Sequence, residues 1–401
     1  MPSTLTWIDH DPAAREQAMR VLALFQERES RDELGLGAVR DSFSDALFPG
    51  TSTLQTRIRY MLFIPWVYKA LEDKCIGPPE FAAKARQSEL ELIDPLLANS
   101  DHDGVFGRIA SKALQRLPSS VYWYGLEAWG IRKIKCSQYQ YHRYIDQVYN
   151  ARDVSRHRIE KDDIPESETQ TWHSRLPDPP AGFPQDIGFE LEPEEAKFLQ
   201  DRLVQSQKGS LLAHLALNHQ PVHCDYIWEH PDLHLFPPEQ SKLVGYAEFF
   251  STLMQGAAFL YNLMLAELAG RDVLIDEHRK NLDEWQERLQ SAPASNLSLV
   301  DLWALTAGRG HKITKRTKGF VSDWNQRVVA TCGDVGDDTE CRTLIKTRER
   351  FLKGVRSRFT NPRARDQWTG YAGVSRMTYR WPNVRTLLAD LHDGLAENNH
   401  A

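Results

Sequence analysis

The 401-residue sequence lacks the cysteine pattern of a disulfide-stabilised or zinc-binding protein. It holds five cysteines, an odd number, and no two of them form a Cys-x-x-Cys pair. Disulfide frameworks and zinc ribbons need paired cysteines at characteristic spacings. The pattern is typical of a reducing compartment, and we therefore predict a cytoplasmic protein.

Long apolar runs are also missing from the sequence. The opening stretch MPSTLTWIDHDP has neither the basic start nor the apolar core of a signal peptide. The most apolar runs, MLFIPWVY and GAAFLYNLMLA, are shorter than the roughly 20 residues that a bilayer-spanning helix needs. We expect no membrane partner.

The common nucleotide-binding and nucleophile motifs are absent as well. We find no Gly-x-x-x-x-Gly-Lys loop, no Gly-x-Gly-x-x-Gly loop and no Gly-x-Ser-x-Gly elbow. The sequence therefore does not indicate a P-loop ATPase, a dinucleotide enzyme or a serine hydrolase. We predict no cofactor and recognise no catalytic constellation.

What the sequence does contain is a series of amphipathic and apolar helical patterns. We predict a mainly α, multi-helical fold with two or three lobes and a Pro-rich connecting segment. The segments are a helical domain over 1–150, a linker or surface excursion over 151–192, a central helical domain over 193–307, and a basic helical region over 308–401. Within the central domain, the apolar pattern over 239–269 predicts a buried helix.

Charge is distributed very unevenly along the chain. From His311 to Arg385 there are 17 Lys or Arg and 7 Asp or Glu, a net charge of +10. Because the whole chain carries −6, the remainder carries −16. A dense basic face repels itself unless it meets anions, either the phosphates of DNA or the acidic remainder of the chain. Both interpretations stay open, and the candidate phosphate-binding residues are Arg342, Lys346, Arg348, Arg350, Lys353, Arg356 and Arg358.

Helical spacing predicts an apolar stripe beside these cations. We expect the helix to continue until Asn361-Pro362, because a residue before proline avoids the α region. Arg342, Lys346, Arg350 and Lys353 would lie on another face of this helix. The predicted stripe consists of Leu344, Ile345, Phe351, Leu352, Val355 and Phe359.

A second candidate contact lies in a helix-turn-helix-like segment over 38–62. A short helical pattern is followed by a Pro-Gly turn and by TSTLQTRIRYML. If the second helix begins near Thr51, Gln55, Arg57 and Arg59 are available to contact DNA. The favoured alternative is an ordinary core helix capped by the hydroxyl residues.

Two patterns permit metal chemistry but fit it poorly. The stretch HQPVHCDYIWEHPDLH gathers several histidines, yet Pro221 and Pro231 interrupt any helix that would present them together. The triplets Glu72-Asp73-Lys74 and Glu195-Ala196-Lys197, the latter with Asp186 upstream, resemble metal-dependent nuclease motifs. Both triplets fall in helical patterns, so a metal-dependent nuclease is the least favoured interpretation.

Several longer stretches point to one family. They include LTWIDHD, RLPSSVYWYGLEAWGIR, GAAFLYNLMLAELA, RERFLKGVRSRFTN and YRWPNVRTLLADL. With these stretches the chain resembles, over nearly its whole length, the prokaryotic family known as domain of unknown function 6361. The resemblance implies an accessory protein of antiviral defence, because family members tend to be encoded near helicases, methyltransferases or nucleases. It assigns no catalytic residues, and a protein scaffold for a helicase, methyltransferase or nuclease partner is the alternative.

Overall fold

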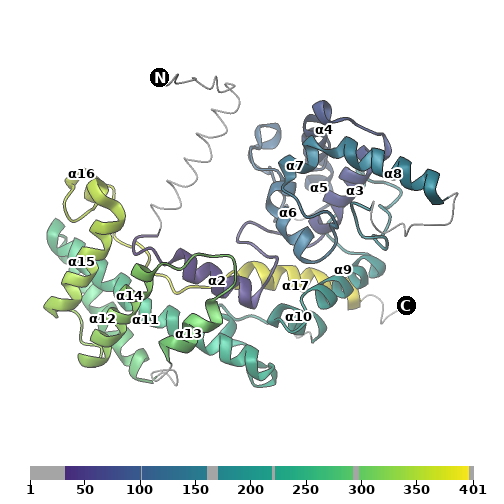
Figure 1. Ribbon diagram of the computed structural model, residues 1–401. Coiled ribbons are helices and arrows are strands. Elements are labelled where there is room, and N and C mark those ends of the chain that lie inside the picture. Colours follow the sequence, from purple (N-terminus) through teal and green to yellow (C-terminus); the bar gives the residue numbers. More distant parts are fainter. Residues whose placement is uncertain (1–31, 101, 160–169, 219–221, 292–297, 397–401) are drawn as a thin grey trace, which may run out of the picture. The chain divides into compact units, whose positions relative to one another are not determined.

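The computed structural model describes residues 32–100, 102–159, 170–218, 222–291 and 298–396 (Figure 1). These residues form helices joined by turns, with no β-strand, which confirms the mainly α prediction. The β pairing they do contain is an isolated antiparallel bridge between Arg132 and Trp172. The predicted N-terminal domain therefore has its first 31 residues outside the described part of the chain.

The chain divides into two compact units, each built from separate stretches of sequence. Unit 1 comprises the residues up to Phe43 together with Gly245–Met377. Unit 2 comprises Ser44–Val244 together with the residues from Thr378 onward. The boundaries that we predicted near 150, 193 and 308 do not coincide with this division. Composition cannot show that the end of the chain returns to pack with residues from its first half.

Unit 1 is organised around one long apolar helix. Helix α11 (Pro238–Ala269) covers the predicted buried stretch and belongs to this unit from Gly245 onward. Trp285 and Trp324 donate their ring N–H groups to its Thr252 and Leu253 carbonyls, at 2.7 and 2.9 Å. The other helices of this unit are α12 (Asp272–Ser291), α13 (Leu299–Thr306), α14 (Lys315–Ala330), α15 (Thr339–Lys353) and α16 (Pro362–Asp366).

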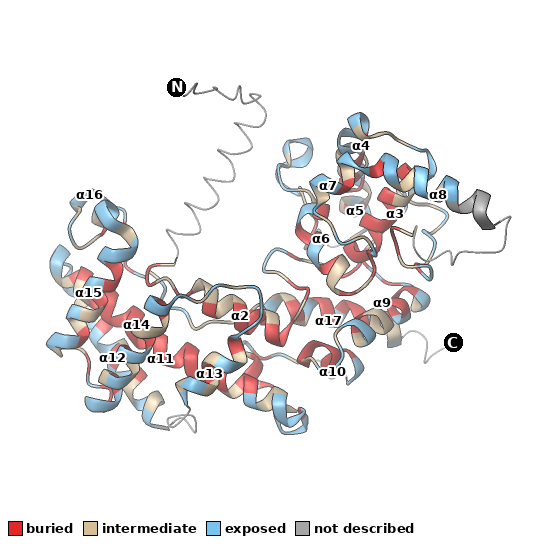
Figure 2. Cartoon of the chain, viewed as in Figure 1, coloured by how far each residue is buried: buried red, intermediate tan, exposed pale blue. Residues whose placement is uncertain are grey.

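Helix α11 passes the length and composition test for a membrane span, with a mean hydropathy of 1.3 over its most apolar 18-residue window. Of that window, 94% is buried inside the fold (Figure 2). Buried core helices of globular proteins have the same composition, because they are apolar on every face.

One group of unit 2 helices packs around the aromatic helix α3 (Tyr60–Asp73), whose residues 60–68 are all buried. Tyr60, Phe63 and Phe189 form one aromatic contact group, and Tyr68, Trp123 and Tyr141 form another. The remaining helices are α4 (Pro78–Glu91), α5 (Ile93–Asn99), α6 (Pro118–Ala128), α7 (Gln138–Arg143), α8 (Ile145–Ile159), α9 (Pro193–Ser206), α10 (Leu211–Leu217) and α17 (Trp381–Ala396).

The Pro-rich segment is not a linker between the units. The described residues of 151–192 belong to unit 2, where α8 runs to Ile159 and residues 170–192 pack onto the helices. Trp172 is buried and donates its ring N–H to Glu72 at 2.7 Å, and Phe189 is buried against Tyr60. Scattered aromatic residues anchor this segment, and local periodicity gives no sign of such long-range packing.

Candidate nucleic-acid interface

The helix-turn-helix prediction is wrong for residues 48–59. Helix α2 (Gly37–Leu47) is followed by a run of turns, and the next helix begins only at Tyr60. Gly50 has a φ of +82°, and the Gln55 amide closes the turn by accepting from the Ser52 N–H and donating to the Gly50 carbonyl. The hydroxyl residues therefore do not cap a helix at this point.

The three predicted contact residues of this segment make their contacts inside unit 2. Gln55 is only 1% exposed, and Arg59 is buried against Glu195 and the Gly188 carbonyl, at 2.9 and 3.0 Å. Arg57 pairs with Asp390 at 2.9 Å. Burial raises the pKa of Asp390, although the hydrogen bond from Arg57 acts in the opposite direction. These arginines are neutralised within the fold rather than presented to a groove.

The end of the basic helix also differs from the prediction. Helix α15 stops at Lys353, where Gly354 adopts a φ of +55°, and a 3₁₀ turn covers Gly354–Arg356. Asn361 caps the following short helix α16 by accepting from the Ala364 N–H at 3.2 Å. Asn-Pro therefore starts a helix here, since proline is favoured in the first turn.

Arg342 lies at the start of α15 and is held by carboxylates of unit 1. Its guanidinium forms a two-pronged contact with Glu267 at 2.6 and 3.0 Å, and it lies 3.3 Å from Asp337. The hydrogen bond to Glu267 raises the pKa of Arg342. This cation meets the acidic remainder of the chain, as the second interpretation of the charge asymmetry predicted.

Arg348 is buried in the interior of unit 1. It donates to the Leu34 carbonyl at 2.9 Å, to the Gly35 carbonyl at 3.2 Å and to the Thr317 hydroxyl at 3.1 Å. Burial lowers the pKa of this guanidinium. Arg348 joins α15 to α14 and to the stretch before α2, and it has no exposed surface for a phosphate.

Lys353 and Arg358 share one buried carboxylate, that of Glu33. The Glu33 oxygens lie 3.3 Å from the Lys353 ammonium and 2.7 Å from the Arg358 guanidinium. Arg358 also donates to the Tyr261 hydroxyl at 3.2 Å, and its backbone N–H donates to Glu349 at 2.8 Å. Both cations therefore have structural partners.

The exposed members of the predicted set are Lys346, Arg350 and Arg356. Lys346 and Arg350 are one turn apart on α15, so they share a face of the helix. The predicted apolar stripe is only partly buried: Ile345 is buried, whereas Phe351 and Val355 are 54% and 89% exposed. Phe351 lies inside α15 and is exposed all the same, whereas Val355 lies beyond the end of the helix.

Two cations of α14 complete this face, and our sequence reasoning had not named them. The Arg316 guanidinium lies 4.3 Å from the centre of the exposed Phe351 ring. Lys315 precedes it in the first turn of α14, where the Thr314 hydroxyl accepts from the Thr317 N–H. The sequence signal that could have identified these two cations is a helix-capping threonine followed directly by Lys-Arg. We call Lys315, Arg316, Lys346 and Arg350, with Phe351, the α14–α15 surface.

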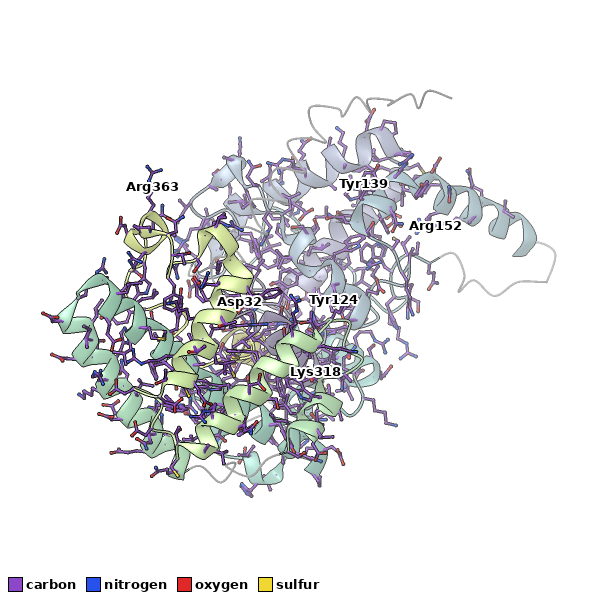
Figure 3. The ribbon with its side chains drawn as sticks, turned by 60° about the vertical axis from the view of Figure 1, so that its left-hand side comes forward. Asp32, Tyr124, Tyr139, Arg152, Lys318 and Arg363 are labelled. Atoms are coloured by element: carbon purple, nitrogen blue, oxygen red, sulfur yellow. The ribbon has the colours of Figure 1, made fainter. Side chains whose placement is uncertain are left out.

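Basic side chains continue beyond this surface onto the neighbouring elements. Figure 3 shows Lys318 on α14 and Arg363 projecting outward from α16. The half-buried Lys318 lies over the Trp303 ring, with its ammonium 5.3 Å from the ring centre. In the stretches 315–322 and 343–356, the single acidic residue is Glu349, and it is fully buried. The exposed charges of these two stretches are therefore all positive.

The nuclease-like triplets do not form a metal site in the described part of the chain. The buried Glu72 accepts hydrogen bonds from Tyr141, Arg152, Thr171 and Trp172. Glu195 is paired with Arg59. No group of three or more His, Cys, Asp or Glu placed to hold a metal occurs among the described residues, and His219 of the histidine-rich stretch lies outside them.

Comparison with known proteins gives one match. The model described as "Family of unknown function (DUF6361)" matches residues 2–395, which confirms the resemblance noted from the sequence. Neither a curated protein nor a solved structure shows significant similarity to the chain.

Proposed function

The chain belongs to the DUF6361 family, and we propose that it is a DNA-associated accessory protein that contacts backbone phosphates through the α14–α15 surface. The observation that supports this proposal is the absence of counter-charges. Within the described residues, Lys315, Arg316, Lys346 and Arg350 are exposed and form no ion pair. The other cations of α15 are held inside their own unit: Arg342 and Lys353 pair with carboxylates, and the buried Arg348 donates to carbonyl and hydroxyl oxygens.

Unpaired, clustered cations are suited to phosphate because binding releases the counter-ions condensed on DNA. Arginine adds the option of two parallel hydrogen bonds to one phosphate. The exposed Phe351 ring, which Arg316 contacts, can stack on a base or lie against the sugar edge. The four cations predict about four phosphate contacts. The salt slope, which is the slope of the logarithm of the binding constant against the logarithm of the salt concentration, would then be about −3.6. The affinity would fall about a hundredfold from 50 to 200 mM salt.

The decisive experiment measures binding of a fluorescent DNA duplex by anisotropy over a range of salt concentrations. We expect the double variant Lys346→Glu/Arg350→Glu to bind weakly and to lose about 2 units of salt slope. The matched control is Lys84→Glu/Lys112→Glu, which changes the same charge at exposed positions of unit 2 that form no ion pair in the described structure. Equal salt slopes for the wild type and both variants would reject the surface as the DNA contact.

The place of this activity in defence against foreign DNA is a further part of the proposal, and it rests on the family resemblance. A cytoplasmic accessory protein of a defence system should be needed for protection. Deleting its gene should raise phage plating efficiency, and the Lys346→Glu/Arg350→Glu variant should fail to restore protection. Restoration by this variant would separate defence from the α14–α15 surface.

A second candidate function is a protein scaffold for a helicase, methyltransferase or nuclease partner. The exposed Phe351, Leu352 and Val355 favour it, because they place apolar side chains among cations. Such a face suits a partner patch with an apolar centre and an acidic rim. Under this function, Val355→Ser should abolish co-purification of the partner, and nuclease treatment should leave the complex intact.

A further inference from the structure

A second group of cations converges in unit 2, where residues from three segments meet. The isolated bridge holds residues 131–133 against 171–173 through two hydrogen bonds of 2.8 Å, from the Lys133 N–H to the Thr171 carbonyl and from the His173 N–H to the Ile131 carbonyl. Lys133 and His173 are therefore fixed on two backbone segments that lie side by side. Arg175 follows His173 by two residues and is exposed.

Helix α9 supplies the remaining cation, Arg202. The His173 ring lies 5.6 Å from the Phe198 ring, one helical turn before Arg202. Gly130 has a φ of +70°, and a Cβ atom there would lie 3.9 Å from an Arg202 guanidinium nitrogen. The Ser206 hydroxyl fixes this side of α9 by donating to the Trp129 carbonyl at 2.7 Å. The bridge and α9 thus bring the cations onto one face.

The cations are close enough to disturb one another's protonation. The pKa of His173 is lowered to about 4, mainly by burial and then by Arg202, Lys133 and Arg175. Burial and Arg202 lower the pKa of Lys133. Burial also lowers the pKa of Arg202, with Asp201 opposing this shift and Arg175 adding to it. His173 is therefore neutral at pH 7, and the other three residues carry the charge of the group.

No carboxylate neutralises this group within the described part of the chain. The nearest acidic residue on α9, Asp201, is paired with Lys197 at 2.9 Å. Lys133, Arg175 and Arg202 form no ion pair in the described structure, whereas Arg57, Arg59, Arg132 and Arg152 of the same unit all have carboxylate partners. The Arg202 guanidinium is instead hydrogen-bonded to the Gln205 side chain, so these three cations keep their charge without a carboxylate partner.

We propose that Lys133, Arg175 and Arg202 form a second binding site for nucleic-acid phosphates, located in unit 2 and independent of the α14–α15 surface. Two arginines beside a lysine offer several convergent N–H donors to the oxygens of phosphodiesters. Lys133 and Arg175 are exposed, so an extended polyanion has access to them. This site takes the place of the contact that the sequence had suggested at Arg57 and Arg59.

The test compares a triple variant, Lys133→Gln/Arg175→Gln/Arg202→Gln, with the wild type in the salt-dependent duplex assay. Glutamine retains hydrogen-bonding capacity and removes charge without reversing it. We expect a loss of about tenfold or more in affinity at 50 mM salt and a slope shallower by about 2.7. The matched control, Lys74→Gln/Lys84→Gln/Lys208→Gln, removes three exposed cations of unit 2 and should bind as the wild type does.

The ring of His173 provides a second readout that needs no variant of the site itself. Phosphate bound among the three cations should raise the pKa of His173, followed by NMR of the labelled imidazole with a short duplex or with inorganic phosphate. A rise with the duplex supports the nucleic-acid site. A rise with inorganic phosphate alone, or no rise with either probe, overturns it.

The two sites share a ligand class but no residues, so each can fail alone. If Lys346→Glu/Arg350→Glu binds normally and the unit 2 triple variant does not, the proposed function at the α14–α15 surface fails and this inference stands. The reverse result rejects this inference and leaves the proposed function intact. Unchanged binding by the triple variant, together with a silent His173 ring, would rule the second site out.

Discussion

The Arg59 guanidinium lies 2.9 Å from the Glu195 carboxylate, with 7% and 4% of the two side chains exposed. The partners are 136 positions apart in the sequence, so this pair fastens the turn before α3 to the first turn of α9. Burial raises the pKa of Glu195, and the hydrogen bond from Arg59 opposes that rise. A charge in this position is compensated only while its partner is present.

Removing Arg59 should therefore destabilise unit 2 strongly. We expect Arg59→Ala to lower the free energy of unfolding by about 3 to 5 kcal/mol, because Glu195 is left buried without its partner. Lys197→Ala, which breaks an exposed pair with Asp201, should cost less than about 1 kcal/mol. Denaturant titration measures both effects. A similar, small cost for the two variants would contradict a structural role for Arg59 and reopen a functional one.

The carboxyl of Glu89 should make stability depend on pH. Burial raises its pKa to about 7, although the Ser119 hydroxyl and N–H donate to it at 2.6 and 2.8 Å. The folded state then holds a proton that the unfolded state loses above pH 4.5, so the free energy of unfolding should fall as pH rises from about 4.5 to 7. The total decrease is of order 3 kcal/mol.

Glu89→Gln removes this titration and provides the control for it. The free energy of unfolding of this variant should fall less than that of the wild type between pH 4.5 and 7. At pH 7 it should match or exceed the wild-type value. Thermal unfolding at a series of pH values measures the difference between the two curves. Parallel curves would show that Glu89 has an ordinary pKa in the folded protein.

Gly256 is required by the packing of a tryptophan against α11. A Cβ atom at this position would lie 2.3 Å from the Trp285 ring, closer than any real carbon contact. Gly256→Ala should therefore cost at least about 1 to 3 kcal/mol through overpacking. Gly245→Ala on the same helix meets nothing within 4 Å and should be neutral or stabilising by up to about 1 kcal/mol. Differential scanning calorimetry of both variants tests this contrast.

The helices were predictable from sequence where the pattern itself is sufficient. The continuous apolar run of α11 identifies a core helix, because a fully buried strand has the same composition but is much shorter. Segments that depend on distant partners were not predictable. Glu72 fixes Trp172 from a hundred positions away, and nothing near either residue indicates that contact.

The candidate site shows the same division between local and distant information. The charge asymmetry located the basic region, but the exposure of each cation depends on carboxylates elsewhere in the fold. Arg342 meets Glu267 and Lys353 meets Glu33, so neither is available to DNA. Arg316 joins the surface because α14 packs against α15, a contact that helical spacing along one segment cannot reveal.

Cations that hold unit 1 together should be separable by mutation from cations that bind DNA. Arg342→Ala removes a half-buried pair with Glu267, and we expect a loss of about 1 kcal/mol in stability with no change in salt slope. Lys346→Ala/Arg350→Ala removes exposed charges without partners in the described structure. Its free energy of unfolding should stay within about 0.5 kcal/mol of the wild-type value, and its salt slope should be shallower by about 2.

Measuring both quantities on both variants gives a two-way comparison, since each variant is the control for the other. Unfolding by urea reports stability, and duplex anisotropy over 50–200 mM salt reports phosphate contacts. If Arg342→Ala also flattened the slope, Arg342 would have to leave Glu267 on binding DNA, and α15 would present one more cation than the structure shows. If Lys346→Ala/Arg350→Ala changed stability alone, the α14–α15 surface would be a structural feature, and the protein-scaffold function would become the better explanation of the exposed Phe351 and Val355.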